Sequence, residues 1–129
     1  MLKAALFGPA PVLAAHVAEA GGELVGIALW YLTFPTYIGR PGIYLESLYV
    51  RRTQRGSGTG KALLAELAEQ CLRRGYSRLH WSVLNWNQPA IDFYASLDAT
   101  PDDDQTRFGL SGDALAALAQ DSAGQHPPR

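Results

Sequence analysis

The chain has 129 residues, 47% of them hydrophobic and 18% charged, and its formal net charge at pH 7 is −1. This length and composition suit one domain with a real hydrophobic core, and the near-zero charge argues against a general nucleic-acid binder, which would usually carry a basic face. No stretch approaches the roughly 20 apolar residues of a membrane span, the N-terminus lacks the apolar run of a signal peptide, and the one cysteine excludes an intrachain disulfide, so we expect a cytoplasmic protein.

Glycine and proline turns divide the first half of the chain into a short helix and three strands. We expect these elements, in chain order, at 2–7, 12–18, 24–32 and 43–50. Gly8 and Pro9 stop the helix, and the glycine turn after the first strand predicts a β-hairpin. Residues 34–42 contain two prolines and two glycines, so they are expected to form a loop.

Helices and strands alternate in the second half. A glycine-rich segment over 54–60 opens a helix that should run to about Arg74, with Gly75 as its stop. Its spacing places on one apolar face Leu64, Leu67, Ala68 and Cys71. Cys71 is therefore expected to be a buried small apolar residue. Further on we expect a strand over 77–84 with Leu79, Trp81 and Val83 on one side. A helix is expected over 91–97, capped by Asn87 and with Pro89 in its first turn. A strand over 106–110 and a helix over 114–119 complete the expected elements.

This order of elements predicts a mixed α/β fold. An antiparallel meander of three strands feeds a strand–helix–strand crossover. We expect one domain over residues 1–120 and a disordered tail over 121–129.

The glycine-rich segment 51–61 has the composition of an anion-binding loop. It lies between a strand and a helix, where the first amides of the helix lack partners and the helix dipole adds partial positive charge. Glycines let the backbone approach phosphate oxygens, and basic side chains come from Arg51, Arg52, Arg55 and Lys61. The alternative is a flexible basic turn whose glycines only reverse the chain.

The spacing of the loop separates the possible phosphate ligands. In a Walker A loop, four residues separate the first glycine from Gly-Lys-Ser/Thr, but Gly56 stands one residue too close to Gly60 and Ala62 replaces the hydroxyl. A Rossmann loop fails as well, because Leu63 occupies its third glycine position. The pattern that fits is Arg-x-x-Gly-x-Gly at Arg55, Gly58 and Gly60, which resembles the pyrophosphate loop of the GNAT acetyltransferases.

The flanking segments extend this resemblance. Residues 43–50, Ile-Tyr-Leu-Glu-Ser-Leu-Tyr-Val, and residues 86–94, Trp-Asn-Gln-Pro-Ala-Ile-Asp-Phe-Tyr, resemble the diamine acetyltransferase branch, which includes the spermidine/spermine and thialysine enzymes. The resemblance runs from about Ala4 to Ala119 and lacks the strand and helix with which relatives begin. It implies a GNAT fold, direct transfer of an acetyl group from acetyl-CoA to a primary amine of a small molecule (a diamine, a polyamine or a lysine-like compound), and a homodimer.

The resemblance also assigns roles to individual residues. It makes Tyr94 the general acid for the CoA sulfur, although Tyr94 also shares a helical stripe with Ile91 and Ala95 and could be a packed aromatic. Glu46, on the same strand face as Tyr44, Leu48 and Val50 by alternation, is either the general base or amine anchor, or an edge residue with a salt bridge. Cofactor binding is implied for Leu48, Tyr49, Val50, Arg55, Gly56, Ser57, Gly58, Thr59, Gly60, Lys61 and Asn87, with the cofactor in a cleft between the third and fourth strands. Tyr37 is a candidate wall of the amine pocket.

Departures from the branch pattern narrow these expectations. Ser47 replaces a common aspartate, and residues 34–37 offer aromatic rings but no acid, which disfavours a multiply charged amine. Asp98 replaces a common glycine, which predicts strain at a helix end. We expect no metal, because His16, His80 and His126 show no ligand spacing. A non-catalytic CoA-binding module and a fragment of a longer acetyltransferase remain open alternatives.

The first expected strand also bears on assembly. Residues 12–18 contain no charged residue and no proline, and in relatives a preceding strand pairs beside them. An unpaired edge of this kind favours association. We therefore expect a homodimer or a larger assembly that covers it.

Overall fold

The computed structural model describes residues 2–102 and 105–123 of the chain. They fall into two units, one up to Trp86 and one from Asn87 onward. The first unit contains helix α1 (Leu2–Phe7), strands β1 (Ala14–Ala20), β2 (Glu23–Thr33) and β3 (Gly42–Val50), a 3₁₀ turn η1 (Arg52–Gln54), helix α2 (Thr59–Arg74) and strand β4 (Leu79–His80); the second contains α3 (Gln88–Ala95) and α4 (Gly112–Ala123).

The sheet has the predicted topology. Its strand order is β1-β2-β3-β4, with antiparallel pairing up to β3 and a parallel pairing between β3 and β4. The meander and the strand–helix–strand crossover are therefore confirmed. The first strand begins at Ala14, because its ladder starts where Ala14 faces Trp30, so the prediction from Val12 to Ala18 was shifted by two residues.

The fourth strand is much shorter than predicted. Only Leu79 and His80 pair with β3, opposite Ile43 and Tyr44, whereas a strand was expected over 77–84. Trp81 and Val83 are half-buried although they belong to no strand. The alternation of these side chains thus reflected partial burial and not backbone pairing.

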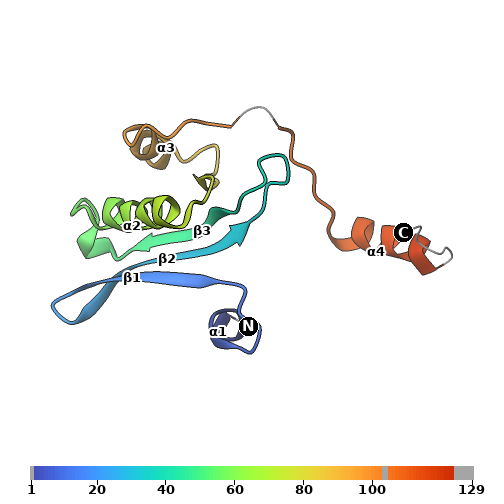
Figure 1. Ribbon diagram of the computed structural model, residues 1–129, viewed down its shortest axis with the longest axis horizontal. Coiled ribbons are helices and arrows are strands. Elements are labelled where there is room, and N and C mark those ends of the chain that lie inside the picture. The colour runs from blue at the N-terminus through green and yellow to red at the C-terminus, as the bar shows by residue number, and fades with distance from the viewer. Residues whose placement is uncertain (1, 103–104, 124–129) are drawn as a thin grey trace. The chain divides into compact units, whose positions relative to one another are not determined.

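Helix α2 covers one face of the sheet (Figure 1). It begins after Gly58 and ends at Gly75, both in the left-handed conformation, so its predicted limits are confirmed. Its buried stripe consists of Leu63, Leu64, Leu67 and Cys71. Ala68 is exposed, and Leu63 takes its place in the buried stripe. Burial of Cys71, as predicted, also raises the pKa of its thiol.

The sheet side of the core is formed by Val25, Ala28, Trp30, Ile43 and Leu45. Trp30 is 8% exposed, and its indole Nε1–H donates to His16 Nδ1 at 2.9 Å. This bond satisfies a buried donor and ties the edge strand β1 to β2.

Strand β3 contains a β-bulge at Glu46. Leu29 faces Ser47 and Trp30 faces Leu45, so Glu46 has no opposite residue in β2. The extra residue shifts the alternation of side chains, and Leu48 and Val50 therefore share the α2 face with Ile43 and Leu45. The prediction that placed Tyr44 on one face with Leu48 and Val50 was wrong for this reason, and Glu46 is the extra residue at which the alternation shifts.

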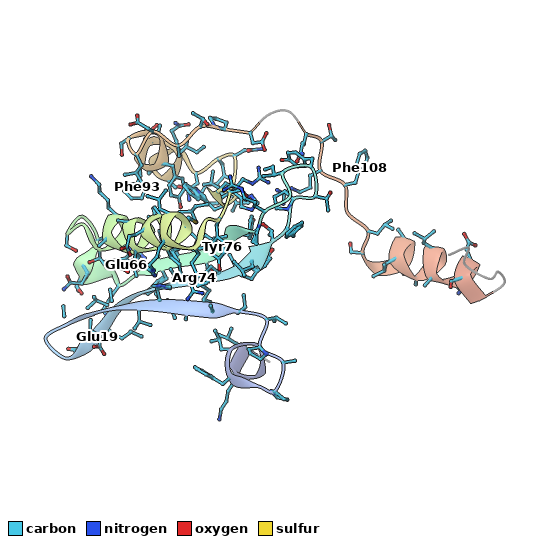
Figure 2. The ribbon with its side chains drawn as sticks, in the orientation of Figure 1. Glu19, Glu66, Arg74, Tyr76, Phe93 and Phe108 are labelled. Carbon is cyan, nitrogen blue, oxygen red and sulfur yellow. The ribbon has the colours of Figure 1, made fainter. Side chains whose placement is uncertain are left out.

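The second unit differs from its prediction in two places. Residues 106–110 form no strand: they enter no ladder with the described residues, and Phe108, labelled in Figure 2, is 90% exposed. The expected helix over 114–119 is confirmed and is longer, and it includes Asp121, Ser122 and Ala123 of the predicted tail. The rest of that tail, with His126, lies outside the described residues. No helix in the described ranges is long and apolar enough to cross a membrane.

Candidate active site

The loop between β3 and α2 presents backbone amides at its helical end. Gly56 and Gly58 have φ of 83° and 88°, and Gly58 is the N-cap of α2. No side chain in the described part of the chain caps this helix; the Ser57 hydroxyl instead bonds to the Gln54 carbonyl and lies 2.9 Å from the Thr59 hydroxyl. The first amides of α2 are therefore available to an anion.

Gly60 differs from Gly56 and Gly58 in its backbone conformation. Its φ is not positive, and an added Cβ would meet Val50 Cγ2 at 3.6 Å and Leu48 Cδ2 at 3.9 Å, which is ordinary contact. Gly56 and Gly58 are the positions at which the backbone itself requires glycine. Gly60 needs no left-handed conformation, because it already belongs to the first turn of the helix.

Only some of the basic side chains around the loop form hydrogen bonds or ion pairs with other described residues. Arg55 Nε donates to the Val50 carbonyl at 3.1 Å, and its guanidinium lies 5.8 Å from the centre of the Tyr49 ring. Arg51 pairs with Glu23 at 3.4 Å. Arg52 and Lys61 are exposed and form no ion pair with other described residues. Positive charge is thus free beside the amides of α2.

The edge of β3 that faces β4 is open next to the loop. The ladder between the two strands ends at Tyr44 and His80, so residues 46–50 pair only with β2 within the described chain. In a strand, alternate residues direct their N–H and C=O groups to opposite sides. An extended ligand could therefore pair with Leu48, Tyr49 and Val50 as an added strand that leads to the loop.

Glu46 stands at the bulge on this open edge. Bulges interrupt a ladder and redirect side chains, and they are frequent next to active sites. The Glu46 side chain is exposed and has no ion pair in the described part of the chain, which removes the alternative of an edge salt bridge there. Its carboxylate is available to a cation or to water.

Two candidate residues lie on the second unit. Asn87 Oδ1 accepts a hydrogen bond from the Ala90 amide at 3.3 Å, which confirms the predicted cap, and Pro89 lies in the first turn of α3. Tyr94 is half-buried, with its ring centre 5.4 Å from that of Phe93, and burial raises the pKa of its phenol. This phenol therefore keeps its proton at neutral pH.

The remaining candidates have simpler surroundings. Tyr37 is 70% exposed in a turn where the Pro35 carbonyl accepts from the amides of Ile38 and Gly39, each at 3.0 Å. His16 is the acceptor for Trp30, and His80 lies in β4. The described residues contain no cluster of three histidine, cysteine or acidic side chains that could hold a metal ion.

The sequence did not reveal a cluster on the sheet face opposite α2. Tyr31 and Tyr44 face each other across β2 and β3, and His80 and Ser82 lie beside Tyr44. These residues are spread over 52 positions of the chain, from Tyr31 to Ser82. Only the strand register brings them together.

Comparison with known proteins decides the family. The sequence profile of the Acetyltransferase (GNAT) family matches residues 3–98. The chain belongs to this family. It is thus an enzyme, an N-acetyltransferase with the GNAT fold, and the co-substrate of the family is acetyl-CoA.

Similar proteins agree with this assignment. The chain is 37% identical to a thialysine N-epsilon-acetyltransferase of Bos taurus, over 92% of this chain and 75% of the relative. It is 34% identical to an L-ornithine N5-acetyltransferase of Arabidopsis thaliana, over 74% of this chain and 42% of the relative. Among solved structures, an integron cassette protein of V. cholerae superposes with a TM-score of 0.80 at 25% identity, over 88% of this chain and 70% of that one.

Proposed function

We propose that the chain transfers the acetyl group of acetyl-CoA directly to a primary amine of a small molecule. Relatives of about one-third identity are enzymes whose names specify thialysine and ornithine as acceptors, and both are small molecules with primary amines. Diamines, polyamines and lysine-like compounds are therefore the acceptor classes with which to begin.

The observation that carries this proposal is the continuity of the β3 edge with the α2 N-terminus. The pantetheine arm would pair with Leu48, Tyr49 and Val50, and the pyrophosphate would contact the loop from Arg55 to Lys61, with its oxygens at the amides that follow Gly58. Arg55, Ser57, Thr59 and Lys61 would add donors, and Asn87 would add a hydrogen bond while it caps α3. This path would place the thioester at the β-bulge, beside Glu46.

The chemistry follows from the two ionisable groups. Glu46 would remove a proton from the acceptor ammonium, directly or through a water molecule, or hold the ammonium by charge. The free amine would attack the thioester carbonyl, so that a C–N bond forms and the C–S bond breaks, and the nitrogen would release its second proton to solvent as the amide forms. Tyr94 would donate its phenolic proton to the departing sulfur and regain a proton from solvent. Tyr37 would line the acceptor side.

Assembly and location complete the proposal. We propose a homodimer in which the edge strand β1 is covered, because β1 pairs only with β2 among the described strands and Val17 is 54% exposed on it. The free thiol of Cys71 fits a reducing compartment such as the cytoplasm.

The direct test is product analysis. Purified protein would be mixed with acetyl-CoA and a library of primary amines, release of CoA thiol would be followed, and acetylated products would be identified by mass spectrometry. We expect acetylation of at least one amine, with stoichiometric thiol release, and its loss in Glu46→Gln and Tyr94→Phe. Tight acetyl-CoA binding without any product across the library would favour a non-catalytic binding module instead.

A further inference from the structure

We infer that Tyr31, Tyr44 and Glu46 form the acceptor-binding surface, and that they select an amine with a single positive charge and an apolar, preferably aromatic, body. The inference rests on the proposed acetyl transfer and names the substrate class of that site. It begins from the sheet face opposite α2, which the core does not use.

The two tyrosines form a fixed aromatic pair. Tyr31 and Tyr44 are direct cross-strand partners, and their ring centres lie 5.3 Å apart with a tilt of 50°. Both rings are half-buried, so part of each remains open to a ligand. Aromatic rings bind the carbon skeleton of an amine by apolar contact and bind its ammonium by cation–π attraction.

Neighbouring side chains hold Tyr44 in place. Its hydroxyl donates to Ser82 Oγ at 3.0 Å, and the His80 ring meets it edge-on with centres 5.1 Å apart. His80 Nε2 lies in turn 3.3 Å from the Thr33 hydroxyl. The aromatic surface is therefore organised before any ligand binds, which lowers the entropic cost of binding.

The charged residues of β2, β3 and the loop between them favour a ligand with a single positive charge. Residues 23–50 contain two acids, Glu23 and Glu46, and one basic residue, Arg40. Glu23 pairs with Arg51 at 3.4 Å, and Arg40 donates to the Gly75 carbonyl at 3.3 Å, in the loop region before β3. Glu46 lies two residues beyond Tyr44. Within residues 23–50, it is thus the one carboxylate that forms no ion pair with another described residue. A second ammonium would find no further unpaired carboxylate among residues 23–50.

These observations favour a monoamine over a diamine. An amine such as 2-phenylethylamine would place its ammonium at the Glu46 carboxylate and its ring on Tyr31 and Tyr44. The ammonium would then stand beside the bulge, where the thioester is proposed to lie. Butane-1,4-diamine offers no ring and leaves its second charge without a partner.

The test measures amine binding separately from cofactor binding. The Kd of 2-phenylethylamine would be obtained by NMR titration of the free protein, and the Kd of acetyl-CoA by calorimetry on the same samples. We expect butane-1,4-diamine to bind about 10-fold more weakly than 2-phenylethylamine. Tyr31→Leu and Tyr44→Leu should each weaken 2-phenylethylamine about 10-fold, while Tyr31→Phe, which keeps the ring, should change its Kd less than about 3-fold.

Two further variants complete the design. Glu46→Gln keeps the shape of an exposed side chain and should also weaken the amine about 10-fold, without disturbing the sheet. Phe108→Leu replaces an aromatic residue that is 90% exposed and should leave the amine Kd unchanged. Equal amine affinity in wild type, both leucine variants and Glu46→Gln would overturn the inference, as would tighter binding of the diamine. Absence of acetyl-CoA binding would instead count against the proposed cofactor loop.

Discussion

The environment of Tyr94 sets the pH range in which it can act. Burial disfavours the charged phenolate, so the pKa of Tyr94 lies above its ordinary value of about 10. A phenol with this pKa remains protonated through the neutral range and can donate its proton to a leaving thiolate. The folded state holds this proton more tightly than the unfolded state, so its contribution to stability is complete below about pH 10 and declines as pH rises further.

Tyr94→Phe should therefore lower kcat by about 100-fold, with little change in acetyl-CoA affinity. In the wild type, no fall in kcat due to Tyr94 should occur below about pH 10, because the phenol keeps its proton. Steady-state rates from pH 6 to pH 11 check both points, with Tyr76→Phe, a tyrosine just beyond α2, as control. Wild-type turnover in Tyr94→Phe, with chemistry rate-limiting, would show that Tyr94 is a packing residue.

Asp98 is in the left-handed region with φ of 64°, which confirms the strain predicted from its replacement of glycine. Asp98→Gly should stabilise the protein by about 0.5 kcal/mol, because relief of the left-handed strain exceeds the greater freedom of glycine in the unfolded chain. Asp98→Ala, which keeps the strain and loses the polar side chain, should be the less stable of the two. Thermal denaturation measures the stabilities of the two variants. Greater stability of Asp98→Ala than of Asp98→Gly would contradict the strain at Asp98.

The residues that sequence placed wrongly share one cause. Simple alternation put Tyr44 on one face with Leu48 and Val50, and this error depends on where the regular pattern of β3 is broken. One extra residue in β3 moves every later side chain to the other face, and no single-sequence pattern marks the position of that residue. The pairing of Tyr31 with Tyr44 was not predicted for the same reason, since it depends on the register.

Helix α2 is held against the sheet by a close approach at Gly26. A Cβ at this position would lie 3.0 Å from Thr59 Cγ2 and 3.2 Å from Leu63 Cδ1. Gly26→Ala should therefore cost about 1–3 kcal/mol of stability and displace the first turn of α2, which weakens acetyl-CoA binding. Adding Thr59→Ser, which removes the opposing methyl, should recover part of both losses.

Gly42→Ala is the matched control for this change. Its Cβ would meet the Arg78 carbonyl at 3.1 Å, and Gly42 lies at the opposite end of β3 from the loop. It should lower stability and leave acetyl-CoA affinity unchanged. Calorimetry and denaturation on the same variants separate the two effects, and an unaltered acetyl-CoA Kd in Gly26→Ala would show that α2 is not positioned from Gly26.

Elements with chemical signals at their ends were predictable, and elements that depend on a partner were not. The limits of α2 follow from Gly58 and Gly75, and the first turn of α3 follows from Asn87 and Pro89. Residues 77–84 and 106–110 were predicted to be strands from the alternation and composition of their side chains. A strand exists only where a neighbour accepts its hydrogen bonds, and pairing with β3 extends only to Leu79 and His80.

Assembly depends on the edge strand β1. If a second copy covers this edge, Val17→Lys should shift the protein toward the monomer, because a charged side chain on an edge strand opposes pairing. Leu72→Lys, at a position 84% exposed on α2, should leave the oligomeric state unchanged. Sedimentation velocity over a range of concentrations measures this state. A wild-type monomer at the highest concentration would refute the dimer.

The central claim is that acetyl-CoA binds through the backbone amides that follow Gly58. Gly58 and Gly22 offer a matched pair, since their φ values are 88° and 80° and a Cβ at either would meet nothing within 4 Å. Valine imposes similar backbone strain at both positions, but only Gly58 lies in the proposed phosphate loop. Calorimetry with acetyl-CoA should give at least a ~10-fold weaker Kd for Gly58→Val, which is about 1.4 kcal/mol, and an unchanged Kd for Gly22→Val. Equal acetyl-CoA affinity in both folded variants and the wild type would contradict the assignment of the loop.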